Sequence, residues 1–428
     1  MQAETMQTAA MTAGTMHPAV SNGSYDVARV RDDFPILGMA VHGKPLVYLD
    51  NAASAQKPKA VLDRLQRAYT AEYANVHRGL HYLANAATEA YEGARGKVAT
   101  FLNAGRNEEI VFTRSATEAI NIVAQTFGRE RIRAGDEIVL SIMEHHANIV
   151  PWHFLRERYG AVIKWAPVDD DGNFLLDEFE RLLTDRTKMV ALTQMSNVLG
   201  TVVPVKNVVR IAHASGIPVL IDGAQASVHL DVDVRDIDCD FYVITGHKLY
   251  GPTGIGVLYG KHEHLCAMPP FNGGGEMIRE VFQDRITYGE PPHKFEAGTP
   301  AIVQAIGLGA AIDYINSLGK ARIRAHEATV TDYAHARLGE INSLRIVGAA
   351  KEKGAIVSFE LKGAHPHDFA TIIDRAGVAV RAGTHCAMPL LERFDVSATV
   401  RASFGLYNTC DEVDCLVRAL TKAREFFT

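Results

Sequence analysis

The chain has 428 residues, of which 47% are hydrophobic and 22% are charged, and its formal net charge at pH 7 is -6. A chain of this length is too long for one simple core, so we expect two domains. The charge balance gives no basic surface for a nucleic acid, and no apolar run approaches the roughly 20 residues of a membrane span. We therefore expect neither a nucleic acid nor a membrane as a partner.

The cysteines and the first residues point to the cytoplasm. The chain has five cysteines, an odd number without a regular spacing, which argues against a disulfide framework and for a reducing compartment. Residues 1–28 contain neither Lys nor Arg, so we expect no secretory signal and no transit peptide there. Residues 1–24, rich in Ala, Thr, Met and Gln, are expected to form a disordered tail.

Apolar runs alternate with amphipathic stretches through the first two thirds of the chain. Predicted strands lie at 108–113, 136–141, 161–167, 189–196, 217–224, 241–246 and 254–260. Predicted helices lie between several of them, at 117–132, 147–159, 176–183 and 205–214. This alternation predicts an α/β domain with a mostly parallel sheet flanked by helices.

After Gly298 the pattern changes. A long helical stretch over 301–338 precedes predicted strands at 355–361, 378–383 and 398–408, a helix at 365–377, and a last helix. Thr409 and Glu412 have the spacing of a capping box for that last helix. We predict a large domain over 40–300 and a smaller α+β C-terminal domain over 301–428, joined by 25–39.

Two residues at strand ends carry the clearest chemical signal. Asp222 ends the apolar run "IPVLIDGAQ", and Lys248 follows the run "FYVITGHK". A buried lysine is costly unless its amine works uncharged, as it does when it forms a Schiff base, and a nearby carboxylate can keep a pyridine nitrogen protonated. The pair predicts a pyridoxal 5'-phosphate (PLP) site. The alternatives are a surface lysine and an aspartate that closes a turn.

Neighbouring motifs support a cofactor site. Thr117 in "TRSATEAIN" opens a predicted helix, where backbone N–H groups bind phosphate, although an ordinary helix cap is the alternative. Gln225 could reach the phenolic oxygen of the cofactor. His145 and His146 point to different faces of a helix, so we expect one of them to stack on a flat ring and no metal to be shared between them.

Two further histidines, His77 and His81, have i, i+4 spacing in "HRGLH". A zinc site there is weakly supported, because Gly79 weakens the helix and no third ligand lies nearby in the sequence. Asn197, after another strand, either contacts a ligand or closes a turn. We expect no metal in this protein.

Cys386 in "VRAGTHCAMP" is the credible nucleophile among the five cysteines. It follows Gly383 and His385 and precedes Pro389, so we expect it in a loop, where Arg381 would favour its thiolate form. Arg401 in "VRASFG" either holds a substrate carboxylate through two hydrogen bonds or pairs with an acidic side chain.

Five separated motifs occur in order: "TEAIN", "MEHHANIVPW", "IDGAQ", "TGHKLYGPTGIG" and "RAGTHCAMPLL". Together they resemble the fold-type I, class V PLP-dependent transferases, and within them the group II cysteine desulfurases of the Suf (SufS) type. The resemblance runs from about Asp32 to the C-terminus. It implies a cytoplasmic homodimer that converts L-cysteine to L-alanine, with a persulfide on Cys386 whose sulfur supplies Fe–S cluster assembly.

The resemblance also implies residue roles. Lys248, Cys386 and His145 are the implied catalytic residues, and Lys248 carries the cofactor covalently. The implied cofactor contacts are Thr117, His145, Asp222, Gln225, Thr245, His247 and Thr299, of which Thr299 reaches toward the partner subunit's cofactor. The implied substrate contacts are Asn197, Arg381, Arg401 and His77.

Some points stay open. Thr384 stands where many relatives have a second histidine, which affects proton donation near Cys386. His367 resembles a histidine of the branch that uses a zinc-dependent SufU-type acceptor, whereas "CAMPLL" favours a SufE-type acceptor, which we prefer. A selenocysteine lyase or another class V PLP enzyme is the alternative function, and a non-catalytic scaffold is a third. A nicotinamide enzyme is disfavoured because no G-x-G-x-x-G follows the first strand.

Overall fold

The computed structural model of the protein describes residues 16–363 and 365–427. Within these residues the main sheet has seven strands in the order β4-β10-β9-β8-β7-β5-β6. Their bounds are β4 Ile110–Thr113, β5 Glu137–Ser141, β6 Val162–Ala166, β7 Thr187–Thr193, β8 Val219–Asp222, β9 Phe241–Thr245 and β10 Gly256–Gly260. β5 to β9 pair in parallel and β10 is antiparallel to both neighbours, so the predicted α/β fold and all seven predicted strands are confirmed.

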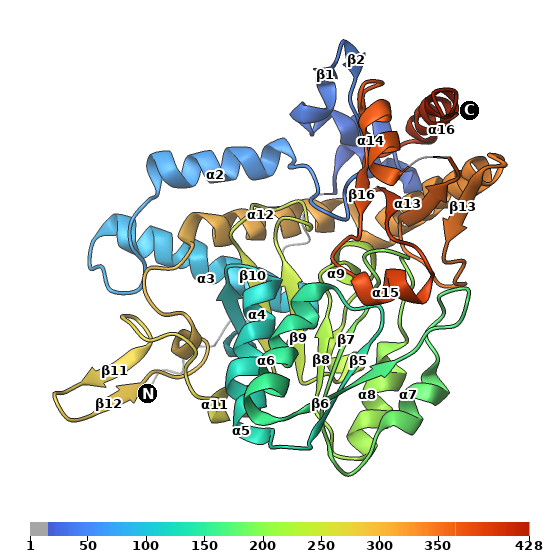
Figure 1. Ribbon diagram of the computed structural model, residues 1–428. Helices are drawn as coiled ribbons and strands as arrows, with labels where there is room; N and C mark the ends of the chain where they lie inside the picture. Colours follow the sequence, from blue (N-terminus) through green and yellow to red (C-terminus); the bar gives the residue numbers. More distant parts are fainter. Residues whose placement is uncertain (1–15, 364, 428) are drawn as a thin grey trace.

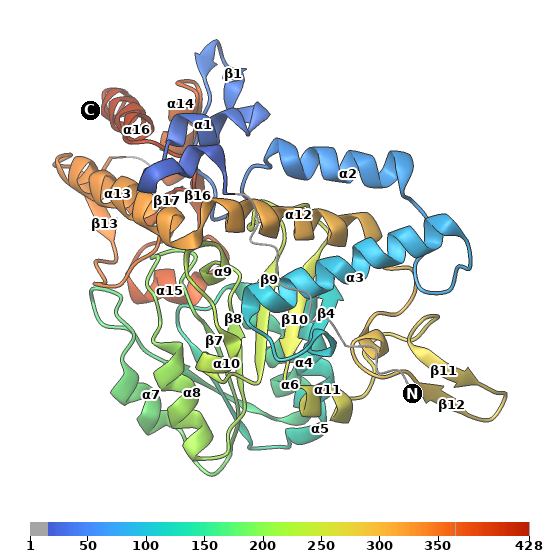
Figure 2. The same cartoon turned by 180° about the vertical axis from the view of Figure 1, so that it is seen from behind.

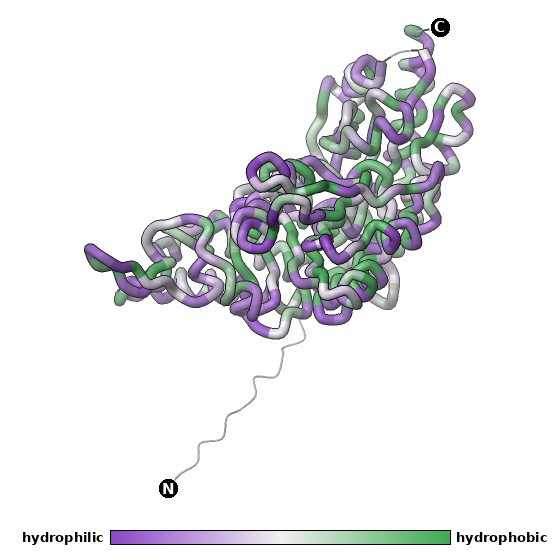
Figure 3. The backbone as a smooth tube through the Cα atoms, turned by 60° about the horizontal axis from the view of Figure 1, so that its bottom comes forward, coloured by the Kyte–Doolittle hydropathy of each residue, from purple (hydrophilic) through white to green (hydrophobic). Residues whose placement is uncertain are grey.

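Helices cover both faces of this sheet (Figures 1 and 2). They are α2 Lys59–Ala71, α3 Tyr82–Leu102, α4 Ala116–Val123, α5 Arg129–Arg131, α6 Val150–Tyr159, α7 Leu176–Leu182, α8 Val205–Ala214, α9 Ala226–His229, α10 Val234–Ile237, α11 His262–Ala267 and α12 Ile302–Leu318. Alternate strand residues enter two separate cores: Val190 packs with α3, α8 and α12, and Ala191 packs with α4 and α6. Because both faces are buried, the strands read as nearly continuous apolar runs. Figure 3 shows these apolar stretches concentrated inside the body.

A second, antiparallel sheet has the order β13-β14-β17-β16. Its strands are β13 Leu344–Val347, β14 Ile356–Leu361, β16 Arg381–Gly383 and β17 Thr399–Ser403. The C-terminal helices are α13 Lys320–Gly339, α14 Pro366–Asp374, α15 Met388–Arg393 and α16 Cys410–Arg424. Side chains of α13, α14 and α16 form a separate core with this sheet. This arrangement agrees with the predicted α+β unit.

The two predicted domain boundaries need correction. β3 (Val47–Tyr48) pairs with β15 (Val378–Ala379), and Val47 and Leu49 are buried in the core of the smaller sheet, so this segment does not belong to the large domain. At the other boundary, α12 packs on the large body, and the chain passes from the large body to the smaller one near Gly319. The physical reason is that α12 is apolar on nearly all sides and must be buried between other elements.

The N-terminal prediction is also corrected. Residues 1–15 of the predicted tail lie outside the described residues. Pro18–Gly23 forms a 3-10 helix in which Ala19 and Val20 are buried, and α1 (Val27–Asp32) follows it. Burial of these two side chains explains why Pro18–Gly23 is structured although it belongs to the predicted tail.

The remaining elements are short strand pairs and a projecting hairpin. β1 (Ala40–Val41) pairs with β2 (Lys44–Pro45), and β11 (Ile278–Val281) pairs with β12 (Ile286–Tyr288). Figure 1 shows the β11–β12 hairpin extending away from the body. No helix in the described part of the chain is long and apolar enough to cross a membrane.

Candidate active site

A cavity of about 290 Å³ lies where the carboxyl ends of the parallel strands meet the smaller sheet. Open α/β sheets place their ligands at this edge. The structure brings eleven of the predicted site residues together around this cavity: Thr117, His145, Asn197, Asp222, Gln225, Thr245, His247, Lys248, Arg381, Cys386 and Arg401.

Lys248 and Asp222 come from neighbouring parallel strands. Asp222 is the last residue of β8, and Lys248 follows the end of β9. Burial lowers the pKa of Lys248 to about 8, although the carboxylate of Asp222 opposes that shift. Near neutral pH a useful fraction of the amine is therefore uncharged and nucleophilic.

Two polar side chains in the cavity wall keep an oxygen without a hydrogen-bond partner among the described residues. Asp222 is buried, with 6% of its surface exposed, and only one of its oxygens accepts a hydrogen bond, from the backbone N–H of Ala224 at 2.9 Å. The hydroxyl of Thr245 is buried without a hydrogen-bond partner. Burial raises the pKa of Asp222, so a cationic group at its free oxygen would favour the carboxylate form.

These features fit a bound PLP. Thr117 lies in the first turn of α4, whose N-cap Ser115 accepts a hydrogen bond from the backbone N–H of Glu118. A helix N-terminus binds phosphate, and the free hydroxyl of Thr245 adds a donor. Asp222 offers the carboxylate that a protonated pyridine requires, and Lys248 offers the amine that binds the aldehyde.

His145 presents an uncharged ring to the cavity. Its Nδ1 accepts a hydrogen bond from the backbone N–H of Ala147 at 3.0 Å. Burial, together with the charge of Lys248, lowers the pKa of His145 to about 4, so the ring is neutral at pH 7. Gln225 donates a hydrogen bond to the carbonyl of Ala52 at 2.8 Å, which fixes its side chain at the cavity wall.

Glu144 is a buried carboxyl group outside the predicted set. It accepts hydrogen bonds from the backbone N–H of Thr193 at 2.9 Å and from the amide of Asn148 at 2.7 Å, and it bonds the hydroxyl of Ser141. Burial raises its pKa to about 8. It anchors the turn that carries His145. Its position directly before His145 in "MEHH" is the sequence feature that could have identified it.

Cys386 lies on an anchored and strained turn. Its thiol is exposed, and both His385 and Cys386 have positive φ angles, of 51° and 57°. The amide of Asn197 donates to the carbonyl of His385 at 2.8 Å, and the backbone N–H of His146 donates to the carbonyl of Cys386 at 2.7 Å. Left-handed conformations of residues other than glycine cluster at functional sites.

The two arginines stand opposite each other on adjacent strands, because Arg381 in β16 is paired in register with Arg401 in β17. Arg401 is almost fully buried and donates to the carbonyl of Asn197 at 2.7 Å. Both guanidinium groups also bind the carboxylate of Asp50, a residue outside the predicted set. Its signal was its place directly after the short apolar segment "LVYLD".

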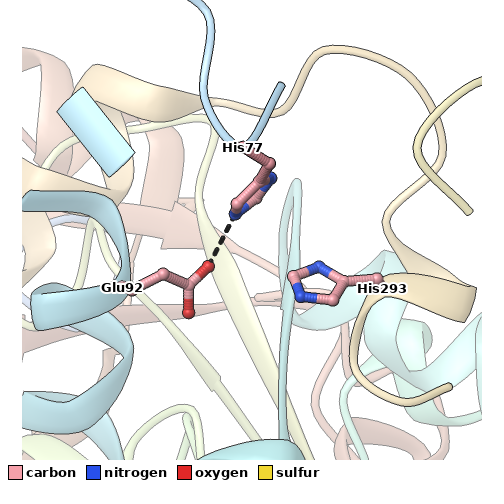
Figure 4. Close-up of side chains that lie close together, drawn as sticks. All are labelled: His77, Glu92 and His293. Carbon is pink, nitrogen blue, oxygen red and sulfur yellow. Dashed lines mark hydrogen bonds and ion pairs between the residues drawn. The ribbon is translucent and has the colours of Figure 1, made fainter. Parts of the chain in front are cut away.

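His77 and Thr299, also predicted for this site, do not line the cavity of their own chain. Nε2 of His77 lies 2.8 Å from Oε1 of Glu92, and its ring centroid is 4.9 Å from that of His293 (Figure 4). The oxygens of Glu92 also accept hydrogen bonds from Arg95. Burial opposes the ionisation of Glu92, but the hydrogen bonds from His77 and Arg95 outweigh it and hold its pKa at about 2.

Ligand atoms of His77, Glu92 and His293 lie within 4.8 Å of one another, close enough to share a cation. His81, the other histidine of the pair considered from the sequence, is not part of this cluster. It caps α3 and accepts a hydrogen bond from the backbone N–H of Ala84. Since Glu92 is already bonded to His77 and to the buried Arg95, the cluster is a hydrogen-bonded network between α3 and the segment around His293.

The sequence of this chain is similar to those of known proteins. The aminotransferase class-V family matches residues 47–416. The chain is 52% identical over 397 residues to a cysteine desulfurase of Dickeya dadantii (strain 3937), which covers 92% of this chain and 96% of that protein. It is 50% identical over 404 residues to a probable cysteine desulfurase of Synechocystis sp., with 94% and 96% covered.

Solved structures agree with this similarity. The crystal structure of the cysteine desulfurase CsdA (S-sulfonic acid) from Escherichia coli matches with a TM-score of 0.88 and 41% identity, over 94% of this chain and all of that one.

Proposed function

The chain belongs to the aminotransferase class-V family, and from that premise we propose that it is a cysteine desulfurase that converts L-cysteine to L-alanine. The enzyme uses pyridoxal 5'-phosphate. The observation that carries the proposal is that one cavity holds Lys248, Asp222 and the exposed thiol of Cys386. An enzyme that only transfers amino groups does not need a thiol at this position.

The binding residues of the cavity divide into two groups by role. Lys248, Asp222, Gln225, His145, Thr117, Thr245 and His247 would hold the cofactor. Bound there, PLP supplies an electron sink beside the α-carbon of the substrate. Arg401 and Asn197 would bind the substrate carboxylate, with Arg381 at the rim.

Two side chains of the protein perform the bond changes. The amine of Lys248 takes the α-proton of the substrate, a role that fits its lowered pKa. The thiolate of Cys386 attacks the substrate sulfur, the C–S bond breaks, and a S–S bond forms on Cys386. The carbon released from sulfur is protonated, so the products are L-alanine and a persulfide on the enzyme.

Mass spectrometry tests the proposal directly. After incubation with L-cysteine without reductant, the peptide that carries Cys386 should gain the mass of one sulfur atom, and L-alanine should appear. The variant Cys386→Ala should bind the cofactor normally but gain no sulfur. Turnover of cysteine without sulfur on Cys386 would instead favour a selenocysteine lyase or another class V enzyme.

We further propose that the persulfide passes to a SufE-type acceptor for Fe–S cluster assembly, as in Suf-type enzymes. An open cavity of about 410 Å³ adjoins Cys386 and is lined by His365, His367, Thr384 and Ser397. It gives a second protein access to the exposed thiol. Sulfur from labelled cysteine should move from Cys386 to a SufE-type protein faster than to a zinc-dependent SufU-type protein.

A homodimer is the expected assembly. Large apolar side chains are exposed around the start of α3 and on the β11–β12 hairpin, including Leu80, Tyr82, Val281, Phe282 and Ile286. Exposed apolar clusters of this kind mark protein interfaces. His77 and Thr299, which lie outside the cavity of their own chain, would then serve the partner subunit's site. Sedimentation at micromolar concentration should give the mass of two chains.

The cytoplasm is the proposed location. All five cysteines are free in the structure, and a persulfide carrier requires a reducing compartment.

A further inference from the structure

One carboxylate is shared between the two arginines of the active site. Nε and an Nη of Arg381 lie 3.2 and 3.1 Å from the carboxylate oxygens of Asp50. An Nη of Arg401 lies 3.3 Å from Oδ1 of the same carboxylate. A single negative charge therefore stands between two positive ones, directly behind the wall of the cavity.

The backbone fixes this carboxylate in place. Asp50 follows β3 and forms a parallel bridge with Ser403, at the end of the strand that carries Arg401. The carbonyl of Asp50 accepts hydrogen bonds from the backbone N–H groups of Ala53 and Ser54 at 3.1 and 3.3 Å. The side chain thus has a defined direction before any substrate binds.

The two arginines depend on Asp50 in different ways. Arg401 is 2% exposed, burial lowers its pKa to about 10, and its Nε has no hydrogen-bond partner among the described residues. Arg381 is half exposed, and the hydrogen bond to Asp50 raises its pKa. Without Asp50, Arg401 would lose its one described anionic partner, and Arg381 would be free to swing.

Both guanidinium groups act electrostatically on Cys386, as does the amine of Lys248. The other titratable groups around this thiol are His145, His146, His247, His365, His367, His385 and Asp222. Burial lowers the pKa of His385 to about 3 and those of His145 and His247 to about 4, so these rings stay neutral at working pH. Of the groups that keep a charge, Asp50 is the one that offsets both arginines.

We propose that Asp50 is a positioning residue that holds Arg381 and Arg401 together in the cavity that contains Cys386 and thereby controls how the reactivity of Cys386 depends on pH. The proposal rests on the proposed role of Cys386 as the sulfur acceptor. With the carboxylate present, Arg401 is held for the carboxylate of the substrate.

The rate of alkylation of Cys386 by iodoacetamide tests the proposal without any turnover. The holoenzyme is labelled between pH 6 and pH 10 without substrate, and the Cys386 peptide is quantified by mass spectrometry. In Asp50→Asn the midpoint of the pH–rate curve should fall by about half a pH unit or more, because two cations then act without their counter-charge. In Arg381→Met the midpoint should rise.

The double variant Asp50→Asn/Arg381→Met should bring the midpoint back toward that of the wild type, which a merely structural role would not do. Asp50→Glu, which keeps the charge, should leave the midpoint in place. Asp63→Asn is the matched control, since Asp63 is exposed and, among the described residues, pairs only with Lys59 on α2. Far-UV circular dichroism and the cofactor absorbance show which variants are folded.

Equal midpoints in the wild type and Asp50→Asn overturn the proposal, whatever Arg381→Met does. If Asp50→Asn does not fold, the other two variants test the proposal. An unchanged midpoint in Arg381→Met, or a lower midpoint in Asp50→Glu, overturns the proposal. Sulfur loading of the wild type by L-cysteine is measured separately. Its absence would reject the desulfurase function while leaving the electrostatic result intact.

Discussion

At the scale of single residues, burial prepares Lys248 and Glu144 for different tasks. Both are buried near the carboxyl edge of the sheet, and burial is the main cause of the pKa shift of each. The low-dielectric surroundings favour the neutral form of each group, so the lysine amine becomes nucleophilic and the glutamate stays protonated. One physical cause therefore gives one reactive group and one structural group.

The lowered pKa of Lys248 predicts the pH dependence of cofactor attachment. In the cofactor-free protein the amine is mostly charged below pH 8 and mostly neutral above it, because its pKa is about 8. The rate of covalent attachment of PLP should rise about tenfold per pH unit below pH 8 and level off above it. Reduction with borohydride followed by mass measurement reports the attachment. Lys248→Ala should show none, and a covalently labelled Lys248→Ala protein would contradict the assignment.

Glu144 predicts a pH dependence of stability. Its pKa is about 8 in the folded protein, whereas the ordinary value for a glutamate, expected in the unfolded chain, is 4.5. Between these values the unfolded chain releases the proton first, so stability falls as pH rises, by up to about 1.4 kcal/mol per pH unit. Urea unfolding of Glu144→Gln from pH 5 to pH 8 should show a smaller fall than the wild type.

The exposed Glu157 supplies the control for that experiment, since Glu157→Gln should follow the wild-type curve. Parallel curves for the wild type and Glu144→Gln would show that the buried carboxyl does not titrate in this window.

At the scale of elements, local signals placed the ends of helices and strands well. α8 begins and ends where its amphipathic pattern predicts, and the capping box of Thr409 and Glu412 forms at the start of α16. α2 and α3 are helices outside the predicted set. The amphipathic pattern of α3 is weak because this helix is rich in alanine, and α3 packs on α12, which is distant in sequence.

The cap of α16 predicts a measurable loss of stability. Oγ1 of Thr409 accepts a hydrogen bond from the backbone N–H of Glu412 at 3.3 Å. Thr409→Ala should lower the free energy of unfolding by about 1 kcal/mol, because the first turn loses this acceptor. Thr421→Ala, in the last turns of the same helix, is the matched control and should change it less. Equal losses in denaturant unfolding would show that the cap is not the cause.

At the scale of the whole molecule, a buried ion pair joins segments that lie about 200 residues apart. Arg95 on α3 binds both carboxylate oxygens of Glu296, at 2.7 and 2.9 Å. Glu296 also accepts a hydrogen bond from the backbone N–H of Phe112 in β4 at 2.7 Å. Both side chains are buried, so the pair ties α3, the sheet edge and the segment before α12 into one body.

Breaking that pair should destabilise the large body strongly. Glu296→Gln leaves Arg95 buried with reduced compensation, and we expect a loss of about 3 kcal/mol or more in the free energy of unfolding. The exposed pair of Lys97 and Asp313 connects α3 with α12. Asp313→Asn should therefore cost less than about 1 kcal/mol. Comparable losses in the two variants would mean that burial does not decide the strength of these pairs.

The sequence by itself determined the α/β class and the seven strands of the main sheet, and it predicted Lys248, Asp222 and Cys386 as site residues, which line one cavity in the structure. These follow from local information, because an apolar run predicts a strand and a polar residue at its end lies at a known edge of the sheet. The motifs added the family, which the comparisons confirm.

Only the tertiary structure decided how distant segments meet. The pairing of β3 with β15, the burial of α12 on the large body, and the contact of Asp50 with two arginines all join residues far apart in the chain. No local pattern encodes such contacts, since a carboxylate after a short strand has many possible partners. These contacts form when the two bodies pack against each other, because burying a charge is costly unless it is paired with an opposite charge.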